Sequence, residues 1–195
     1  MHKKHKAKVG IIAEDSNDYH SISKLLKQGF PDVQFVELIK SQRGSQLDSL
    51  RKMRTLLKSA LDRKGRECSY IILVRDLDHE SFREKRMGWF REIAKISQAK
   101  ETIPCLLVLE LEALILADIQ ALNRKQGVQM TFSGNPEKQE NPKEYLSQKM
   151  RIQGKRFSEN DNPLIFSYLN LQTILNNHAS FREFFQIFQE KMKNI

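Results

Sequence analysis

Residues 70–78 read YIILVRDLD, a run of apolar side chains that ends in two aspartates. A short run rich in isoleucine, leucine and valine is typical of a strand buried inside a parallel sheet. Ligands bind at the carboxyl ends of the strands in an open α/β sheet. Asp76 and Asp78 follow such an end, and from an extended segment they can point the same way and bind a hard cation through oxygen. A simple turn is the alternative interpretation, because Asp-x-Asp is also common in turns.

Three more apolar runs of the same character lie at residues 8–13, 33–39 and 103–109. Between the four runs lie amphipathic segments at residues 19–28, 46–63 and 82–97. These segments repeat apolar residues at helical spacing, and the alternation of strand and helix predicts right-handed βαβ crossovers. We therefore expect an α/β domain over residues 7–122, with a mainly parallel four-stranded sheet that is covered by helices on both faces.

Residues 123–195 differ in composition and are expected to form a loop and a helical extension packed on the same domain. The stretch 123–141 has no clear periodicity and is predicted to be a long mobile loop. The helices expected after it, with a basic loop at 151–163, lie at residues 142–150, 163–176 and 180–192. An aromatic stripe on the last helix has the spacing of a face docked on a core, and it consists of Phe181, Phe184, Phe185 and Phe188.

The chain is basic, with 33 Lys+Arg against 24 Asp+Glu and a formal net charge of +9. This balance favours a polyanionic partner such as nucleic acid, although a basic protein without that role is the alternative. Cys68 and Cys105 lie in or beside apolar runs without metal-ligand spacing, which predicts buried thiols in a reducing compartment. The apolar run near the N-terminus is too short for a signal peptide or a membrane span, so we expect a cytoplasmic protein with no membrane partner.

Acids also follow the first predicted strand, in the sequence EDSND at residues 14–18. Helix capping explains part of this cluster, with Ser16 or Asn17 as the N-cap and Asp18 in the first turn. Capping does not require Glu14, which precedes the cap, so we interpret Glu14 as a functional carboxylate. Asp18 stays open between a capping role and a metal-binding role.

The fourth apolar run is followed by Glu110 and Glu112. An acid in so apolar a stretch is costly to bury unless it is paired or coordinates a cation. Glu112 opens the next helix and can face the edge of the sheet, whereas Glu110 can equally lie on the opposite face. Asp118, nearly two turns further along, is expected either to support the site or to lie on the surface. Acids at three strand ends of a basic protein predict a divalent metal bound against a phosphate, and therefore phosphoryl chemistry on nucleic acid.

This arrangement resembles the Toprim domain of topoisomerases, bacterial primases and the OLD (overcoming lysogenization defect) nucleases. The likeness rests on a Glu at the end of the first strand and Asp-x-Asp at the end of the third. The fuller pattern, AEDSND at 13–18, RDLD at 75–78, LEALILAD at 111–118 and SFREF at 180–184, is similar to small stand-alone Toprim-like proteins. Those proteins are often encoded beside ABC-type or AAA ATPases in prokaryotic anti-phage loci. Asp15 stands where the Toprim glutamate is usually followed by Gly, and no Tyr-bearing cleavage domain accompanies the pattern.

The resemblance implies that Glu14, Asp76 and Asp78 are metal ligands and the acid–base centre, with Glu112 as an additional ligand. It implies a Mg²⁺- or Mn²⁺-dependent nuclease that works in antiviral defence with an ABC/AAA-type ATPase as partner. Nothing in the chain forms a Gly-x-x-x-x-Gly-Lys phosphate loop, so the ATPase must be a separate subunit.

Phosphodiester cleavage needs an activated water and a stabilised leaving oxygen, which one or two Mg²⁺ ions about 4 Å apart can supply. The expected contacts to nucleic acid come from the basic loop at 151–163 and from the end of the helix before it, namely Lys149, Arg151, Lys155 and Arg156. A solvated loop without contacts to nucleic acid is the alternative. Two other classes compete with the nuclease. A phosphoacceptor domain is disfavoured because it uses a single Asp after the third strand. A noncatalytic nucleic-acid- or ATPase-binding subunit with the same fold stays open.

Overall fold

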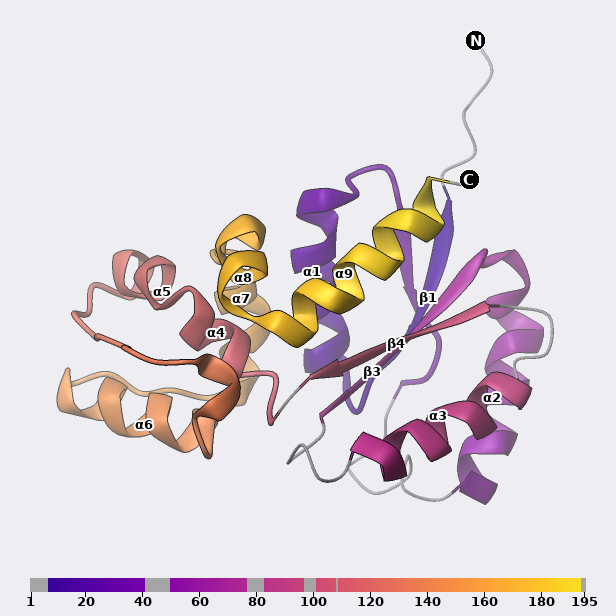
Figure 1. Ribbon diagram of the computed structural model, residues 1–195, viewed down its shortest axis with the longest axis horizontal. Helices are drawn as coiled ribbons and strands as arrows, with labels where there is room; N and C mark the ends of the chain where they lie inside the picture. Colours follow the sequence, from indigo (N-terminus) through magenta and orange to yellow (C-terminus); the bar gives the residue numbers. More distant parts are fainter. Residues whose placement is uncertain (1–6, 41–49, 77–82, 97–100, 108, 194–195) are drawn as a thin grey trace, which may run out of the picture.

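Four parallel strands form the centre of the fold, in the order β2-β1-β3-β4 (Figure 1). The computed structural model describes residues 7–40, 50–76, 83–96, 101–107 and 109–193. The strands are β1 (Lys8–Ile12), β2 (Gln34–Glu37), β3 (Tyr70–Asp76) and β4 (Glu101–Leu107). Their pairing in register, such as Val9 with Tyr70 and Asp76 with Leu107, confirms the predicted α/β class with a parallel four-stranded sheet.

Both faces of the sheet are buried. Successive side chains of a strand point to opposite faces, so each strand contributes to both. Ile72 and Val74 of β3 pack in one hydrophobic cluster, whereas Ile71 and Leu73 pack in the other. The crossover helices are α1 (Ser16–Gly29), α2 (Leu50–Arg63) and α3 (Arg83–Ile96). Figure 1 shows α2 and α3 on one face of the sheet and α1 on the other.

The rest of the described chain is helical and lies mainly on the α1 side of the sheet (Figure 1). Its helices are α4 (Ala113–Ala117), α5 (Ile119–Gln126), α6 (Pro142–Ile152), α7 (Asn162–Phe166), α8 (Leu171–Asn177) and α9 (Ala179–Met192). Helix α7 packs on α1, and α9 packs on β4. These helices belong to the same hydrophobic cluster as β1, β3 and α1, so residues beyond 123 help to complete the main core.

The aromatic stripe of α9 is buried, as the sequence predicts. Phe181 and Phe188 are fully buried, and the rings of Phe184 and Phe188 stack with centroids 6.1 Å apart. Phe188 also meets Phe30 edge to face at 4.8 Å, which fixes α9 against the end of α1. Such aromatic pairs add stability beyond the burial of their surface.

Two sequence predictions in this region are wrong. A single helix over 163–176 was expected, but the structure has α7 and α8, because the Asn170 side chain accepts a hydrogen bond from the Thr173 amide at 2.9 Å and starts α8 anew. The stretch 123–141 was expected to be mobile, yet Met130 is buried and its backbone bonds to both ends of the Asn123 amide, at 2.7 and 3.1 Å.

Three smaller points complete the fold. The predicted strand at 103–109 begins and ends earlier, and Leu109 follows it with a left-handed backbone (φ 67°) that turns the chain away from the sheet. Cys68 and Cys105 are buried thiols, as expected. Among the described residues, no helix has both the length and the apolar character required to cross a bilayer.

Candidate functional site

A small acidic cavity of about 160 Å³ lies at the carboxyl ends of β1 and β3. Six of its lining residues are acids, which are Glu14, Asp15, Asp18, Asp76, Glu112 and Glu159. The other lining residues are Asn17, Leu111 and Asn162. The structure therefore brings four of the five predicted metal-site acids to one place, and the fifth, Asp78, lies outside the described residues.

The turn after β1 places two of these acids. Asp15 caps α1, and its carboxylate accepts a hydrogen bond from the Asp18 amide at 2.9 Å. The prediction of a cap at Ser16 or Asn17 is wrong, because the Ser16 hydroxyl instead donates to the Glu37 carboxylate at 2.6 Å. Asp18 sits in the first turn of α1 and also lines the cavity, so its helical position and its place in the cavity are compatible.

Arg75 is a member of the site that sequence reasoning missed. It lies within β3 and is only 3% exposed, and its Nε atom is 3.1 Å from Oε1 of Glu14. A buried guanidinium requires an anionic partner, and this ion pair holds Glu14 at the mouth of the acidic cavity. The available signal was an arginine between Val74 and Asp76, inside an otherwise apolar strand.

The ionisation of the acids is strongly perturbed. Burial raises the pKa of Asp76 well above its usual value, and the charges of Asp18, Glu14 and Glu112 raise it further. Burial, followed by the charges of Asp15, Glu14 and Glu112, raises the pKa of Asp18 to about 8. Such shifts arise when several carboxylates share a small space. Perturbed acids in a cleft are a characteristic of functional sites.

Glu112 lies between β4 and α4 and is 5% exposed. It precedes α4 without bonding the helix amides, and its Oε1 accepts a hydrogen bond from Nδ2 of Asn162 at 2.9 Å. Burial raises the pKa of Glu112, and the hydrogen bond from Asn162 opposes that rise. Asn162, at the start of α7, was not predicted as a site residue, because Asn-Pro in the sequence indicates only a helix start.

Two neighbouring acids do not line the cavity. Glu110 accepts a hydrogen bond from the Lys143 amide at 3.2 Å. Asp118 is 5% exposed, and its carboxylate accepts from the amides of Ala121 at 3.3 Å and Asn170 at 2.7 Å. The expectation that Asp118 supports the site or lies on the surface is wrong, since it is a buried cap that joins α5 to the start of α8.

The acids of the cavity do not form a ready-made metal cage. Within the described part of the chain, no three His, Cys, Asp or Glu side chains are placed so that together they could hold a metal ion. Glu14 is instead drawn to Arg75, and Glu112 to Asn162. A cation would have to recruit carboxylates by side-chain rotation or be completed by residues beyond those described.

The predicted nucleic-acid contacts fall into two groups. Arg151, Lys155 and Arg156 are exposed and line a second depression of about 400 Å³ at the end of α6. Gly154 (φ 69°) turns the chain there, and the Lys155 amide bonds back to the Met150 carbonyl at 2.9 Å. Lys149 does not line this depression, and its ammonium group lies 5.4 Å from the centre of the Tyr145 ring. Three of the four predicted cations are thus gathered in one place.

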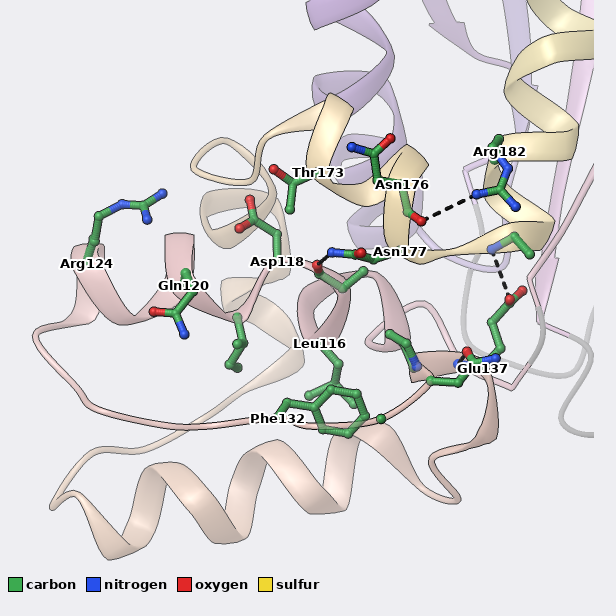
Figure 2. A pocket seen from close by; sticks show the side chains of 16 residues that line it. Leu116, Asp118, Gln120, Arg124, Phe132, Glu137, Thr173, Asn176, Asn177 and Arg182 are labelled. Atoms are coloured by element: carbon green, nitrogen blue, oxygen red, sulfur yellow. Dashed lines mark hydrogen bonds between the residues drawn. The ribbon is translucent and has the colours of Figure 1, made fainter.

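A larger cavity of about 770 Å³, which the sequence analysis did not predict, lies between α4, α5, α8 and the start of α9 (Figure 2). Two arginines, Arg124 and Arg182, and several amide side chains line it. The two acids in its wall, Asp118 and Glu137, accept hydrogen bonds from backbone amides. No residue predicted for metal or nucleic acid lines it.

Comparison with known proteins places the chain in a family. None of the curated proteins and none of the solved structures matches the chain. A family described as a domain of unknown function, DUF4276, matches residues 13–189, which include the acidic cavity and nearly all of the helical extension. The chain therefore belongs to the DUF4276 family.

Proposed function

We propose that this protein is a divalent-cation-dependent nuclease that hydrolyses phosphodiester bonds of DNA or RNA at the acidic cavity. One observation carries the proposal: Glu14, Asp76 and Glu112 lie at or beyond the ends of three different strands and still line one small cavity. Core packing does not require this convergence, which costs stability through mutual repulsion. The pattern resembles the Toprim site, and the parallel sheet supports that resemblance without testing it.

The chemistry of the side chains fits Mg²⁺ or Mn²⁺, which take oxygen ligands. Glu14, Asp18, Asp76 and Glu112 supply carboxylate oxygens, and Asp78 is proposed as a further ligand. The raised pKa values of Asp18, Asp76 and Glu112 mean that their negative charges lack compensation in the protein alone. A doubly charged cation would favour the ionised forms and offset the repulsion.

When bound, the cation would lower the pKa of a water nucleophile and stabilise charge on the leaving oxygen. The side chains of the protein have separate tasks. Arg75 holds Glu14 at the mouth of the cavity, and Asn162 holds Glu112 within it.

The depression formed by Arg151, Lys155 and Arg156 would bind the phosphate backbone, which brings affinity with little sequence specificity. An ion pair between Lys143 and Glu159 connects the start of α6 with the rim of the acidic cavity. We further propose, on the resemblance alone, that an ABC/AAA-type ATPase regulates the nuclease in antiviral defence. The alternative is a noncatalytic nucleic-acid- or ATPase-binding subunit with the same fold.

The decisive experiment is cleavage of labelled single-stranded DNA, duplex DNA and RNA by the purified protein with Mg²⁺ or Mn²⁺. We expect cleavage that EDTA abolishes. Asp76→Asn should reduce it by at least a hundredfold while preserving the circular dichroism spectrum, because it removes a proposed carboxylate ligand of the cation. Asp62→Asn, an exposed change on α2, is the matched control. Cleavage that resists EDTA, or full activity of Asp76→Asn, would refute the assignment.

A further inference from the structure

Asn162 stands out among the residues of the acidic cavity because only one end of its amide is engaged. It is 2% exposed, and Nδ2 donates to Oε1 of Glu112 at 2.9 Å. Its carbonyl oxygen, Oδ1, is buried and accepts no hydrogen bond from any residue in the described ranges. Asn162 also lines the cavity itself.

The orientation of this amide follows from its neighbour. An ionised carboxylate only accepts hydrogen bonds, so the nitrogen must face Glu112 and the oxygen must face elsewhere. The start of α7 does not use that oxygen either, since no side chain makes the cap there and Pro163 has no amide proton to donate. Buried polar atoms in native proteins are nearly always satisfied, and an exception indicates an unseen ion, water or function.

We propose that Asn162 is a residue of the cation site, where Nδ2 positions Glu112 and Oδ1 is an oxygen ligand of the divalent cation. This inference rests on the proposed function and adds a ligand that the Toprim resemblance does not contain. A neutral amide oxygen is an ordinary ligand of hard cations. It also adds coordination without adding charge to a cavity that already holds six acids. The absence of a negative charge on the amide is a physical reason for an asparagine rather than an aspartate at this position.

Several contacts hold the segment that carries Asn162 over the cavity. Asn17 Nδ2 donates to Oδ1 of Asn160 at 3.3 Å, and Lys24 Nζ donates to the Pro163 carbonyl at 2.7 Å. The Lys143–Glu159 ion pair fixes the same segment from α6. The cation would therefore join the sheet edge to the helical extension, and its binding should depend on residues from both.

The test measures Mn²⁺ binding rather than cleavage, by electron paramagnetic resonance of free Mn²⁺ during titration. Asn162→Leu keeps the size of the side chain and removes both polar atoms. We expect it to weaken Mn²⁺ binding about tenfold or more, as loss of a ligand or of its supporting hydrogen bond does. Asn162→Asp retains an oxygen at this position and should bind Mn²⁺ better than Asn162→Leu. Asn176→Leu, an exposed change of the same kind on α8, is the control and should stay within twofold of wild type.

A second measurement uses the wild-type protein, so it stands even if Asn162→Leu does not fold. Substoichiometric Mn²⁺ should broaden the side-chain amide resonance of Asn162 beyond detection and leave that of Gln189 visible, because Gln189 lies near the end of α9 that contacts the start of β3. If wild type binds no Mn²⁺, the proposed function fails and this inference fails with it. If wild type binds Mn²⁺ but Asn162→Leu binds equally well, or the Asn162 resonance persists in the bound protein, only the role of Asn162 is overturned.

Discussion

Asp18 shows how the acidic cavity limits stability at the scale of one residue. Its pKa of about 8 in the folded protein compares with about 4 in an unfolded chain. Because the folded state disfavours the ionised form, stability falls as pH rises from about 4 to about 8, and the full cost is present above 8. The protein without metal therefore carries a penalty at neutral and alkaline pH that a bound cation would relieve.

Asp18→Asn is expected to raise the melting temperature in EDTA at pH 8.5 by several degrees, or about 2 kcal/mol. The gain should shrink toward pH 4, where the aspartate is mostly protonated in both states. The cap of α1 remains, because the Asp18 backbone amide and not its side chain bonds to Asp15. Differential scanning calorimetry from pH 4 to 8.5 measures the effect, with Asp62→Asn as control. No gain at pH 8.5 would show that Asp18 is not under the repulsion described.

At this scale the sequence predicted the acids better than their partners. Glu14 and Asp76 could be predicted because an acid at the end of an apolar run has few structural explanations. Glu112 could be predicted because it opens the next helix and can face the edge of the sheet. Arg75 and Asn162 could not, since an arginine near a strand end and an asparagine before proline both have ordinary local interpretations. Their roles arise from neighbours distant in sequence: Arg75 pairs with Glu14, and Asn162 with Glu112.

At the scale of elements, the start of α9 is held by a buried histidine and a carboxylate. Nδ1 of His178 accepts from the Phe181 amide at 3.4 Å, and Glu137 accepts from the amides of Ala179 and Ser180 at 2.9 and 2.8 Å. Burial lowers the pKa of His178 to about 4, although the charge of Glu137 opposes that shift. Burial alone would raise the pKa of Glu137, but the hydrogen bonds at α9 and the charge of His178 lower it overall. This helix start therefore favours a neutral histidine and an ionised glutamate.

His178→Asn should reduce the loss of stability on acidification. The unfolded chain protonates His178 near pH 6.5 and the folded protein only near 4, so stability falls across that window, by about 2 kcal/mol at pH 5. Asparagine can still cap α9 but does not titrate. Urea denaturation at pH 7 and pH 5 tests this. The readout is the difference between the free energies of unfolding at the two pH values. A packing loss that is the same at both pH values does not change that difference. An unchanged difference would contradict the assignment.

Among the elements, the strands were predictable because their apolar runs leave no exposed face. The break between α7 and α8 was not, because residues 163–176 have acceptable helical spacing throughout. The deciding features are the Asn170 cap and the bond from its own amide to Asp118 at 2.7 Å. The second of these is a tertiary contact across 52 residues, which local periodicity cannot reveal.

At the scale of the whole molecule, a chain with a formal net charge of +9 contains an acidic cavity. If Arg151, Lys155 and Arg156 contact phosphates, changing all three to Gln should flatten the dependence of nucleic-acid affinity on salt. We expect the slope of log Kd against log salt to fall by about 2 to 3 for duplex DNA. Fluorescence anisotropy between 50 and 300 mM salt gives the slopes.

A matched control changes three exposed lysines elsewhere, Lys58, Lys138 and Lys193, to Gln and produces the same net charge. If both triple variants lower the slope equally, binding depends on overall charge and the depression at the end of α6 has no special role. If neither does, the proposed interface is wrong.

The fold class was predictable at this scale, because strands and helices that alternate along the chain can form few topologies. The phenylalanine stripe indicated that the last helix docks, but not on which surface. Only the structure places Phe188 beside Phe30 and Phe35, on the sheet face shared with α1.

The place of α7, α8 and α9 in the main core has a consequence for biosynthesis. During translation, β1 and α1 leave the ribosome first, whereas the helices that cover their apolar face emerge only after residue 162. A partly made chain thus exposes that face, and it also lacks Glu159 and Asn162 from the wall of the acidic cavity. Truncated products would be suitable substrates for chaperones and proteases. If the protein is the proposed nuclease, this order of synthesis completes the cavity only after residue 162 has been made, which would delay cleavage of nucleic acids in the cell that produces it.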